Sequence, residues 1–328
     1  HKEYRRQRQM CIRDSTGTDP IAKENSMIVK PAALKPGRRA VIGMGLGLAA
    51  LGLGARSPAG AQGQPTLYFS AIPDDDETRL MQRFSGVAAY LERQLGVPVR
   101  YVPVKDYAAS VVAFRNDQIQ LGWFGGLTGV QAQLAVPGSQ AIAQGDEDAR
   151  FVSYFIAHES TGLQKSDGFP MGARGMSFTF GAQTSTSGRL FPDYYIRKET
   201  GEAPDEFFSR VGFSGDHAQT LRLVSTGAYQ VGALNYTVYE KAVAEQAPEV
   251  ATTRVIWQTP PFPDYNWTIR GDVDARFGEG FIEKVRAALI GMTDPALLES
   301  FPRKAFIPTS NEAYQPILET GRALGLLD

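Results

Sequence analysis

The chain has 328 residues and a formal net charge of −1, with 34 basic against 35 acidic side chains. Residues 62–328 hold 23 Lys and Arg against 31 Asp and Glu, a net charge of −8, which argues against a basic surface for nucleic acid or acidic lipid. Cys11 is the only cysteine, and residues 62–328 contain just His158 and His217 as histidines, so we expect no disulfide, no metal centre and no cofactor.

The first 61 residues are interpreted as two segments outside the folded protein. Residues 1–26 are polar and lack apolar periodicity, which is typical of a non-native or unstructured leader. Residues 27–61 have the order of a cleavable signal peptide: basic residues, an apolar stretch, and Ala59-Gly60-Ala61. Arg38-Arg39 resembles a twin-arginine signal, while the Sec pathway and an uncleaved anchor stay open as alternatives. We expect export to the periplasm.

From residue 62 onward, strand-like and helix-like segments alternate. Strands are predicted over 66–72, 97–102, 119–124, 151–157, 177–181, 230–234 and 254–257. Helices are predicted over 77–95, 107–116, 127–134, 188–199, 218–225, 238–246, 275–290 and 312–324. This alternation predicts an α/β fold with mainly parallel sheets, and the length fits two lobes. Ligands of such sheets bind where strands end and helices begin.

The most informative of these junctions is the run from Gly181 to Gly188, which contains Thr184-Ser185-Thr186-Ser187. A helix start presents unpaired amide groups and a partial positive charge, so it can hold an anion. Ser185, Thr186 and Ser187 add hydroxyl donors, and Gly188 allows close approach. The simpler interpretation is an ordinary helix cap, which needs only one hydroxyl. The two interpretations stay open at this point.

Two further junctions carry a histidine and a carboxylate. His217 follows Ser214-Gly215-Asp216 and falls in the first turn of a helix, where it could donate to an anion; a surface histidine is the simpler interpretation. Asp264 lies in the rigid run Pro260-Pro261-Phe262-Pro263-Asp264-Tyr265 and offers a fixed acceptor. Beside an anion it is repulsive unless a proton or a cation intervenes, and a turn or cap aspartate is its simpler interpretation.

The fourth junction combines Asp106-Tyr107-Ala108 with Trp123-Phe124-Gly125-Gly126. Tyr107 could supply a phenolic donor, and the two aromatic residues could form the wall of a cleft. Buried aromatic side chains are more often part of a core. The acidic run at 74–77 precedes a helix, so we interpret it as a cap and not as a metal site.

Taken together, these motifs resemble the phosphonate/phosphite-type periplasmic binding proteins of ABC importers. The resemblance runs from about Pro65 to the C-terminus. It rests on five motifs in the family's order: Val104-Lys105-Asp106-Tyr107, Gly122-Trp123-Phe124-Gly125-Gly126, Thr184-Ser185-Thr186-Ser187-Gly188, Ser214-Gly215-Asp216-His217 and Pro261-Phe262-Pro263-Asp264. A branch usually described as selenate-binding is closer still, through Ile72-Pro73-Asp74, Ala135-Val136-Pro137-Gly138-Ser139 and Tyr154-Phe155-Ile156-Ala157-His158.

The resemblance implies a type II, two-lobed α/β binding protein with a hinge and an inter-lobe cleft. Lobe 1 would comprise 62–158 and 259–328, and lobe 2 would comprise 159–258. The implied ligand contacts are Tyr107, Ser185, Thr186, Ser187, His217 and Asp264, joined by Phe124, which stands where relatives often carry a tyrosine. The implied partners are a small oxyanion, an ABC permease and its ATPase subunit, with the protein itself a monomer and not an enzyme.

The expected mechanism is capture of a tetrahedral oxyanion on the turn from Ser185 to Ser187, with Tyr107 and Phe124 closing over it. The candidates are phosphonate, phosphite, phosphate, selenite and selenate. An ionised Asp264 can accept a proton from a ligand that keeps one near neutral pH, as the phosphorus oxyanions and selenite do. Selenate keeps none, so we predict that it binds less well.

Three other functions are compatible with parts of the sequence. A binding protein for an organic sulfonate or a heterocycle would use a larger apolar pocket, lined by Trp123, Phe124, Trp257, Phe262, Tyr265 and Trp267. A hydrolase would combine Ser185 or Ser187 with His217 and Asp264, but the sequence lacks the G-x-S-x-G elbow. A ligand sensor would need a separate receptor to carry the signal.

Overall fold

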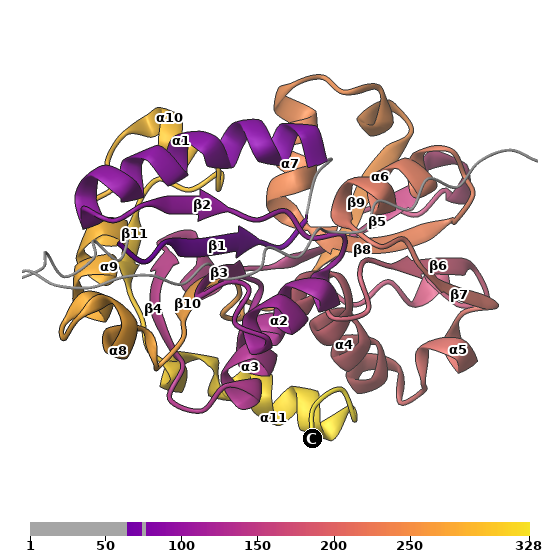
Figure 1. The fold of residues 1–328 in the computed structure, drawn as a ribbon. Helices are drawn as coiled ribbons and strands as arrows, with labels where there is room; N and C mark the ends of the chain where they lie inside the picture. The colour runs from indigo at the N-terminus through magenta and orange to yellow at the C-terminus, as the bar shows by residue number, and fades with distance from the viewer. Residues whose placement is uncertain (1–63, 74–76) are drawn as a thin grey trace, which may run out of the picture. The chain divides into compact units, whose positions relative to one another are not determined.

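The structure is a computed structural model that describes residues 64–73 and 77–328 (Figure 1). The expected leader (1–26) and signal peptide (27–61) lie outside the described residues, as does most of the acidic run at 74–77. Within the described ranges, every helix is too short or too polar to span a membrane.

Two sheets organise the described residues. The sheet of the first lobe has the strand order β11-β4-β10-β3-β1-β2. Its strands are β1 (Leu67–Ala71), β2 (Val99–Tyr101), β3 (Leu121–Phe124), β4 (Gln140–Gly145), β10 (Asn266–Ile269) and β11 (Phe306–Pro308). The sheet of the second lobe has the order β7-β6-β8-β5-β9. Its strands are β5 (Ser153–His158), β6 (Ser177–Phe180), β7 (Arg210–Phe213), β8 (Val231–Asn235) and β9 (Thr253–Gln258).

Helices follow most strands and cover the sheets (Figure 1). Those of the first lobe are α1 (Glu77–Leu95), α2 (Tyr107–Arg115), α3 (Gly126–Ala135), α8 (Val273–Phe277), α9 (Phe281–Ile290), α10 (Pro295–Leu298) and α11 (Gln315–Ala323). Those of the second lobe are α4 (Phe191–Thr200), α5 (Pro204–Phe207), α6 (His217–Ser225) and α7 (Tyr236–Ala244). Short 3₁₀ turns span Glu147–Arg150, Glu159–Thr161, Met171–Ala173, Pro248–Ala251 and Asn311–Tyr314.

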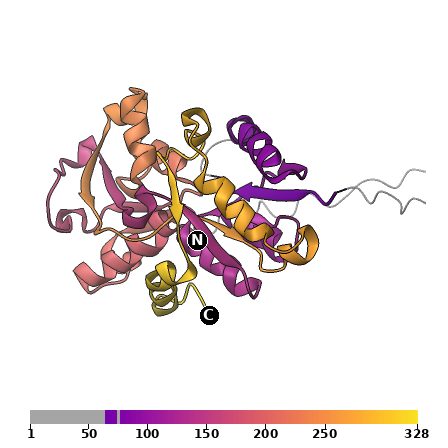
Figure 2. The ribbon, with the colours of Figure 1, turned by 90° about the vertical axis from the view of Figure 1, so that its left-hand side faces the viewer.

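Helix α1 shows why the predicted pattern produces this fold. Its apolar side chains recur every three or four residues, so they form one stripe that the sheet can bury. The residues of that stripe are all at most 3 % exposed: Leu80, Phe84, Val87, Leu91 and Leu95. At the other end of the chain, α11 (yellow) lies beside α3, which Figures 1 and 2 show from two directions.

The chain passes between the two sheets twice, once between β4 and β5 and once between β9 and β10. The two crossing segments pair with each other. Phe151 and Phe262 exchange backbone hydrogen bonds of 2.8 and 2.9 Å, and the Asp264 N–H donates to the Asp148 carbonyl at 3.0 Å. Asp264 therefore lies on the second crossing segment, at the junction of the lobes.

Several expectations need correction. Both sheets are mixed and not mainly parallel, because the strands next to the crossings, β5 and β10, run antiparallel to their neighbours. Strand β5 also pairs in the second sheet, so the first passage between the sheets lies before Ser153 and not after His158.

Strands β4, β7, β10 and β11 were not predicted. The helix predicted over 275–290 is two helices, because Gly278 and Gly280 have positive φ angles of 104° and 80°.

Candidate functional site

Residues 184–187, all Ser or Thr, form what we call the hydroxyl-rich turn. It continues as a π-helical turn, Thr186–Leu190, which runs directly into α4. Ser185 is its N-cap, since the Ser185 Oγ accepts from the Gly188 N–H at 2.9 Å. The Gly181 N–H also donates to the Gly188 carbonyl at 2.8 Å. A Cβ on Gly188 would come within 3.1 Å of both Gly181 Cα and His217 Cε1, so only glycine allows this close approach. The helix-cap interpretation is therefore correct for Ser185.

The next hydroxyl, Thr186, has a different partner: its Oγ1 accepts from the Leu127 N–H at 2.9 Å, across the boundary between the lobes. Asp264 Oδ1 accepts from the neighbouring Gly126 N–H at 2.9 Å. Helix α3 has Gly125 as its N-cap residue and therefore has no side chain of its own to cap it. Two side chains from elsewhere in the chain take that role. The hydroxyl-rich turn thus lies at the contact between the lobes.

The Asp264 carboxyl is the acidic group of the site, and it is only 1 % exposed. Its pKa is raised to about 7, mainly by burial and also by the charge of Asp148, against the lowering effect of the Gly126 N–H and the Thr186 and Ser187 hydroxyls. Oδ2 is buried and has no well-formed hydrogen bond among the described residues. Near neutral pH this carboxyl can therefore either accept a proton or provide one.

His217 is buried at 1 % exposure, so the surface interpretation is wrong. Its Nδ1 accepts from the Asn235 backbone N–H at 3.2 Å, and Asp216 serves as the N-cap of α6. Burial lowers the pKa of His217 to about 3, so the ring is neutral at physiological pH. With Nδ1 acting as acceptor, the proton is assigned to Nε2. Nε2 is buried without a hydrogen-bond partner among the described residues, which leaves it as an oriented donor.

Tyr107, the first residue of α2, is 2 % exposed. Its ring lies edge-on to the His217 ring with the centroids 6.4 Å apart, so the first lobe meets the second here as well. Asp106 caps the helix, because its Oδ1 accepts from the Ala109 N–H at 2.7 Å. Tyr107, Thr186, His217 and Asp264 therefore come together from four elements that are distant in sequence.

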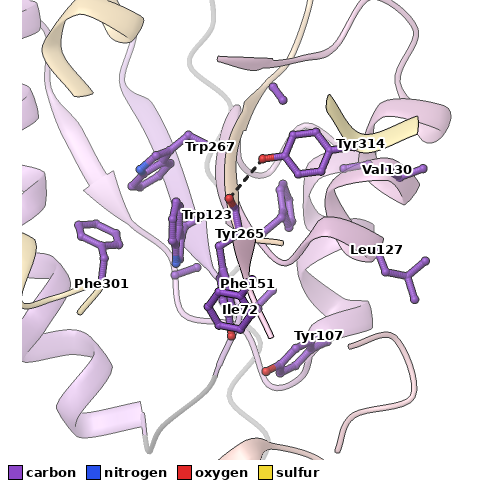
Figure 3. Packing of buried hydrophobic residues seen from close by; sticks show 14 of the residues in the cluster. Ile72, Tyr107, Trp123, Leu127, Val130, Phe151, Tyr265, Trp267, Phe301 and Tyr314 are labelled. Atoms are coloured by element: carbon purple, nitrogen blue, oxygen red, sulfur yellow. Dashed lines mark hydrogen bonds between the residues drawn. The ribbon is translucent and has the colours of Figure 1, made fainter. Parts of the chain in front are cut away.

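Phe124 has a different environment. Its ring covers Gly122 in the same strand and meets Phe114 of α2 edge-on at 5.6 Å. These contacts all lie within the first lobe, so they make Phe124 a support beneath α2. Its predicted contact with ligand stays a prediction. Trp123 points to the opposite face of the sheet and stacks on Tyr265 at 5.5 Å (Figure 3).

The aromatic residues proposed for a larger apolar pocket all belong to one continuous buried core, part of which is shown in Figure 3. Within it, Trp257 packs on Phe155 in the second lobe at 5.2 Å, far along the cluster from Trp123 and Trp267. Of the six, only Trp123 and Tyr265 line a groove between the lobes. This arrangement gives no support to a heterocycle or sulfonate pocket built from them.

Sequence reasoning missed three groups of this site. Asn235 links His217 to Tyr265, through its backbone N–H and through a side-chain hydrogen bond of 3.0 Å. Gly126 and Leu127 contribute amides at the start of α3. An asparagine between a predicted strand and a predicted helix is a cap signal that could have drawn attention to Asn235. The roles of Gly126 and Leu127 follow from a contact between lobes, which no local pattern encodes.

The electrostatics of the site come from helix starts and not from cationic side chains. None of the seven predicted contact residues is Lys or Arg, and His217 is neutral. The first turns of α2, α6 and the π-helical turn supply oriented amides and partial positive charge, whereas the first two amides of α3 already donate to Asp264 and Thr186. In the part of the chain that the structure describes, no group of three His, Cys, Asp or Glu side chains is arranged to hold a metal ion. The arrangement suits a small anion that shares a proton with Asp264.

Comparison with known proteins identifies the family of this chain. The family model described as "ABC transporter, phosphonate, periplasmic substrate-binding protein" matches residues 69–314. The chain belongs to this family. It is accordingly a periplasmic substrate-binding component of an ABC transporter, a role that includes a small-molecule ligand and the transporter's membrane and ATPase subunits as partners.

Among relatives of the phosphonate-binding family, the "Probable ABC transporter phosphite binding protein PhnD1" of Prochlorococcus marinus (strain MIT 9301) is 37 % identical over 265 residues, covering 79 % of this chain and 89 % of the relative. The structure of that PhnD1 in complex with methylphosphonate superposes with a TM-score of 0.76, covering 79 % of this chain and 98 % of the other. The phosphonates-binding periplasmic protein of Escherichia coli (strain K12) is 24 % identical over 211 residues, 63 % of this chain and 62 % of that protein. These matches confirm the predicted family and its two-lobed type II fold.

Proposed function

We propose that this protein captures a small phosphorus oxyanion, phosphite or a short phosphonate, in the periplasm and presents it to its ABC permease. One observation carries the proposal. A buried donor, His217 Nε2, and a buried acceptor, Asp264 Oδ2, lack well-formed partners among the described residues, and both groups lie beside the same hydroxyl-rich turn. Buried polar atoms are normally paired, so such a donor and acceptor together indicate a polar ligand.

The proposed ligand oxygens accept hydrogen bonds from His217 Nε2, from the hydroxyls of the turn and from amides at the helix starts. Asp264 makes affinity depend on the protonation state of the ligand. When ionised, it accepts the proton of a monoanionic ligand; when protonated, it donates to a dianion. In both cases one proton is shared between carboxyl and ligand. Above the pKa of both groups the two negative charges repel, so affinity falls.

The relatives support the choice of ligand class. One is named as a phosphite-binding protein, and its structure holds methylphosphonate. Phosphite and methylphosphonate both keep a proton near neutral pH, which matches the chemistry of Asp264. The resemblance to the selenate-binding branch stays a prediction, and selenate is expected to be the weaker ligand because it has no proton to share.

Hydrolysis is disfavoured by the direction of one hydrogen bond. A serine–histidine–aspartate triad requires the histidine Nδ1–H to donate to the acid. Here Nδ1 accepts from the Asn235 N–H, so it has no proton to give to Asp264. We infer a binding function without catalysis.

We also infer that the protein is exported through a cleavable signal in residues 27–61, in which Arg38-Arg39 favours the twin-arginine route. We infer further that it acts as a monomer.

Isothermal titration calorimetry with phosphite, methylphosphonate, phosphate, selenite and selenate tests the proposal. We expect Ser187→Ala, Thr186→Ala and Ser185→Ala each to weaken binding about tenfold or more, because each removes a hydroxyl that contacts or positions the anion. Ser85→Ala, at an exposed serine of α1, is the matched control and should bind as the wild type does. Undiminished affinity in all three turn variants would refute the proposed site. Tightest binding of selenate at neutral pH would refute the role of Asp264.

A further inference from the structure

A groove of about 450 Å³ lies between the lobes, next to the candidate site. Arg83 of α1 and the Phe301–Arg303 segment border it on the first lobe, and α6 and α7 border it on the second. The buried aromatic residues Trp123 and Tyr265 also line it, at 3 % and 2 % exposure. His217 and Asp264 do not line this groove, although the residues that follow them in sequence, Ala218 and Tyr265, do. The groove and the site are thus adjacent but separate.

Asn235 and Tyr265 contact both the groove and residues of the site. Both line the groove, and both are only 2 % exposed. On the other side, the Asn235 N–H donates to His217 Nδ1, and Tyr265 follows Asp264 directly in the chain. The Asn235 Nδ2 donates to the Tyr265 Oη at 3.0 Å, from β8 of the second lobe to the second crossing segment. This hydrogen bond therefore connects the second lobe to the crossing segment that carries Asp264.

We propose that the Asn235–Tyr265 pair is a partition that determines ligand size, so that the closed site accepts a phosphorus oxyanion carrying hydrogen or methyl and excludes longer alkyl substituents. This inference rests on the proposed function. A propyl chain leaving the anion site toward the groove has to displace the Asn235 side chain and deprive its buried amide of the Tyr265 oxygen that accepts from it, which is costly. With the partition removed, the same chain can enter the groove and contact the faces of Trp123 and Tyr265.

The variant Asn235→Ser tests the partition without removing the helix cap. Asn235 Oδ1 accepts from the Thr237 N–H at 2.7 Å as the N-cap of α7, and serine is an equally good N-cap residue. Serine is shorter and lacks the amide that reaches Tyr265. Tyr265→Phe is the complementary variant, because it removes the hydrogen bond and retains the bulk of the ring.

Titration calorimetry with methylphosphonate and propylphosphonate gives the readout as a ratio of the two Kd values. We expect wild-type protein to prefer methylphosphonate by about tenfold or more. Asn235→Ser should bring this ratio close to one, mainly through tighter binding of propylphosphonate. Tyr265→Phe should lower the ratio only in part, because displacing Asn235 then breaks no hydrogen bond to residue 265 while the bulk of the ring remains. Asn116→Ser, at the exposed C-terminus of α2, is the matched control and should change neither Kd value.

Two results would overturn the partition: wild-type protein that binds both phosphonates equally well, or an Asn235→Ser ratio equal to that of the wild type while thermal unfolding shows the variant to be folded. Failure of the proposed function has a different signature. In that case wild-type protein binds neither methylphosphonate nor phosphite, and the partition, which depends on that function, is rejected with it.

Discussion

At the scale of single residues, burial has opposite effects on the two ionisable groups of the site. It keeps His217 neutral by lowering its pKa to about 3, and it favours the protonated form of Asp264 by raising its pKa to about 7. Both shifts disfavour charge, so at neutral pH His217 is neutral and the Asp264 carboxyl is about half protonated. The site can therefore use helix starts and hydroxyls to hold an anion, without a cationic side chain.

These shifts predict an unusual dependence of stability on pH. Between the unfolded and folded pKa values of Asp264, 3.8 and about 7, the folded state holds the proton, so stability falls as pH rises. For His217, between 6.5 and about 3, the unfolded state holds the proton, so stability falls as pH drops. From about pH 4 to 6.5 the two contributions oppose each other and nearly cancel.

Asp264→Asn separates these contributions. The variant retains an acceptor for the Gly126 N–H but does not titrate, so its stability should rise with pH from about 4 to 6.5, following His217 alone. At pH 8 it should be more stable than the wild type by up to about 4 kcal/mol, the linkage value of a shift of this size. Urea unfolding of the ligand-free protein at pH 4, 6 and 8 measures this. Parallel pH profiles for the two proteins would contradict the assignment.

At the scale of secondary-structure elements, the start of α3 depends on residues from other parts of the chain. Its first two amides donate to Asp264 and Thr186, and its own N-cap residue is a glycine. Ordinary helices are capped by the residue directly before them. Because one of the two acceptors belongs to the second lobe, capping of α3 is coupled to contact between the lobes.

Thr186→Val is expected to weaken contact between the lobes without affecting the folding of either lobe. Valine matches the shape of threonine but removes the acceptor, so the Leu127 N–H is left unpaired only when the lobes are in contact. We expect methylphosphonate affinity to fall about tenfold, with little change in the stability of the ligand-free protein. Thr186→Ser, which keeps the hydroxyl, should retain most of the affinity. Calorimetry and thermal unfolding together check this, and equal affinities for the two variants would argue against the coupling.

At the scale of the whole molecule, a buried ion pair joins distant parts of the chain near both crossings. Arg303 Nη2 and Nε each lie 2.7 Å from a carboxylate oxygen of Asp148, with side chains 2 % and 0 % exposed. The guanidinium also lies 5.1 Å from the centroid of the Tyr265 ring. Through the Asp148 carbonyl, the pair is linked to the backbone of Asp264. It therefore helps to fix the segment that carries the acidic group of the site.

Arg303→Met should destabilise the protein by about 3–5 kcal/mol, because it leaves the Asp148 carboxylate buried without its counter-charge. Adding Asp148→Asn should recover part of this loss. Arg270→Met is the comparison, since Arg270 pairs with Asp272, whose side chain is 54 % exposed and can be solvated, and the loss there should be smaller. Equilibrium urea unfolding gives the three values. A double variant no more stable than Arg303→Met would show that charge imbalance is not the cause.

Much of the fold follows from local patterns. The helices over 77–95 and 107–115 and the strand at 67–71 lie where apolar spacing predicts them. Strand β10, with all four residues buried, has no alternation to mark it as a strand and was missed. The predicted parallel character failed for a related reason: strands beside the crossings acquire their direction from the path of the chain between the lobes.

The amino-acid sequence by itself determined the α/β alternation, the hydroxyl-rich turn, the histidine at the start of a helix and the aspartate after a rigid proline-rich segment, because caps, turns and amphipathic spacing are properties of neighbouring residues. Only the tertiary structure decided that His217 is neutral and Asp264 able to hold a proton, that α3 is capped from the other lobe, and that Asn235 meets Tyr265. Those properties depend on burial and on contacts between residues tens to more than a hundred positions apart, and a one-dimensional pattern carries neither.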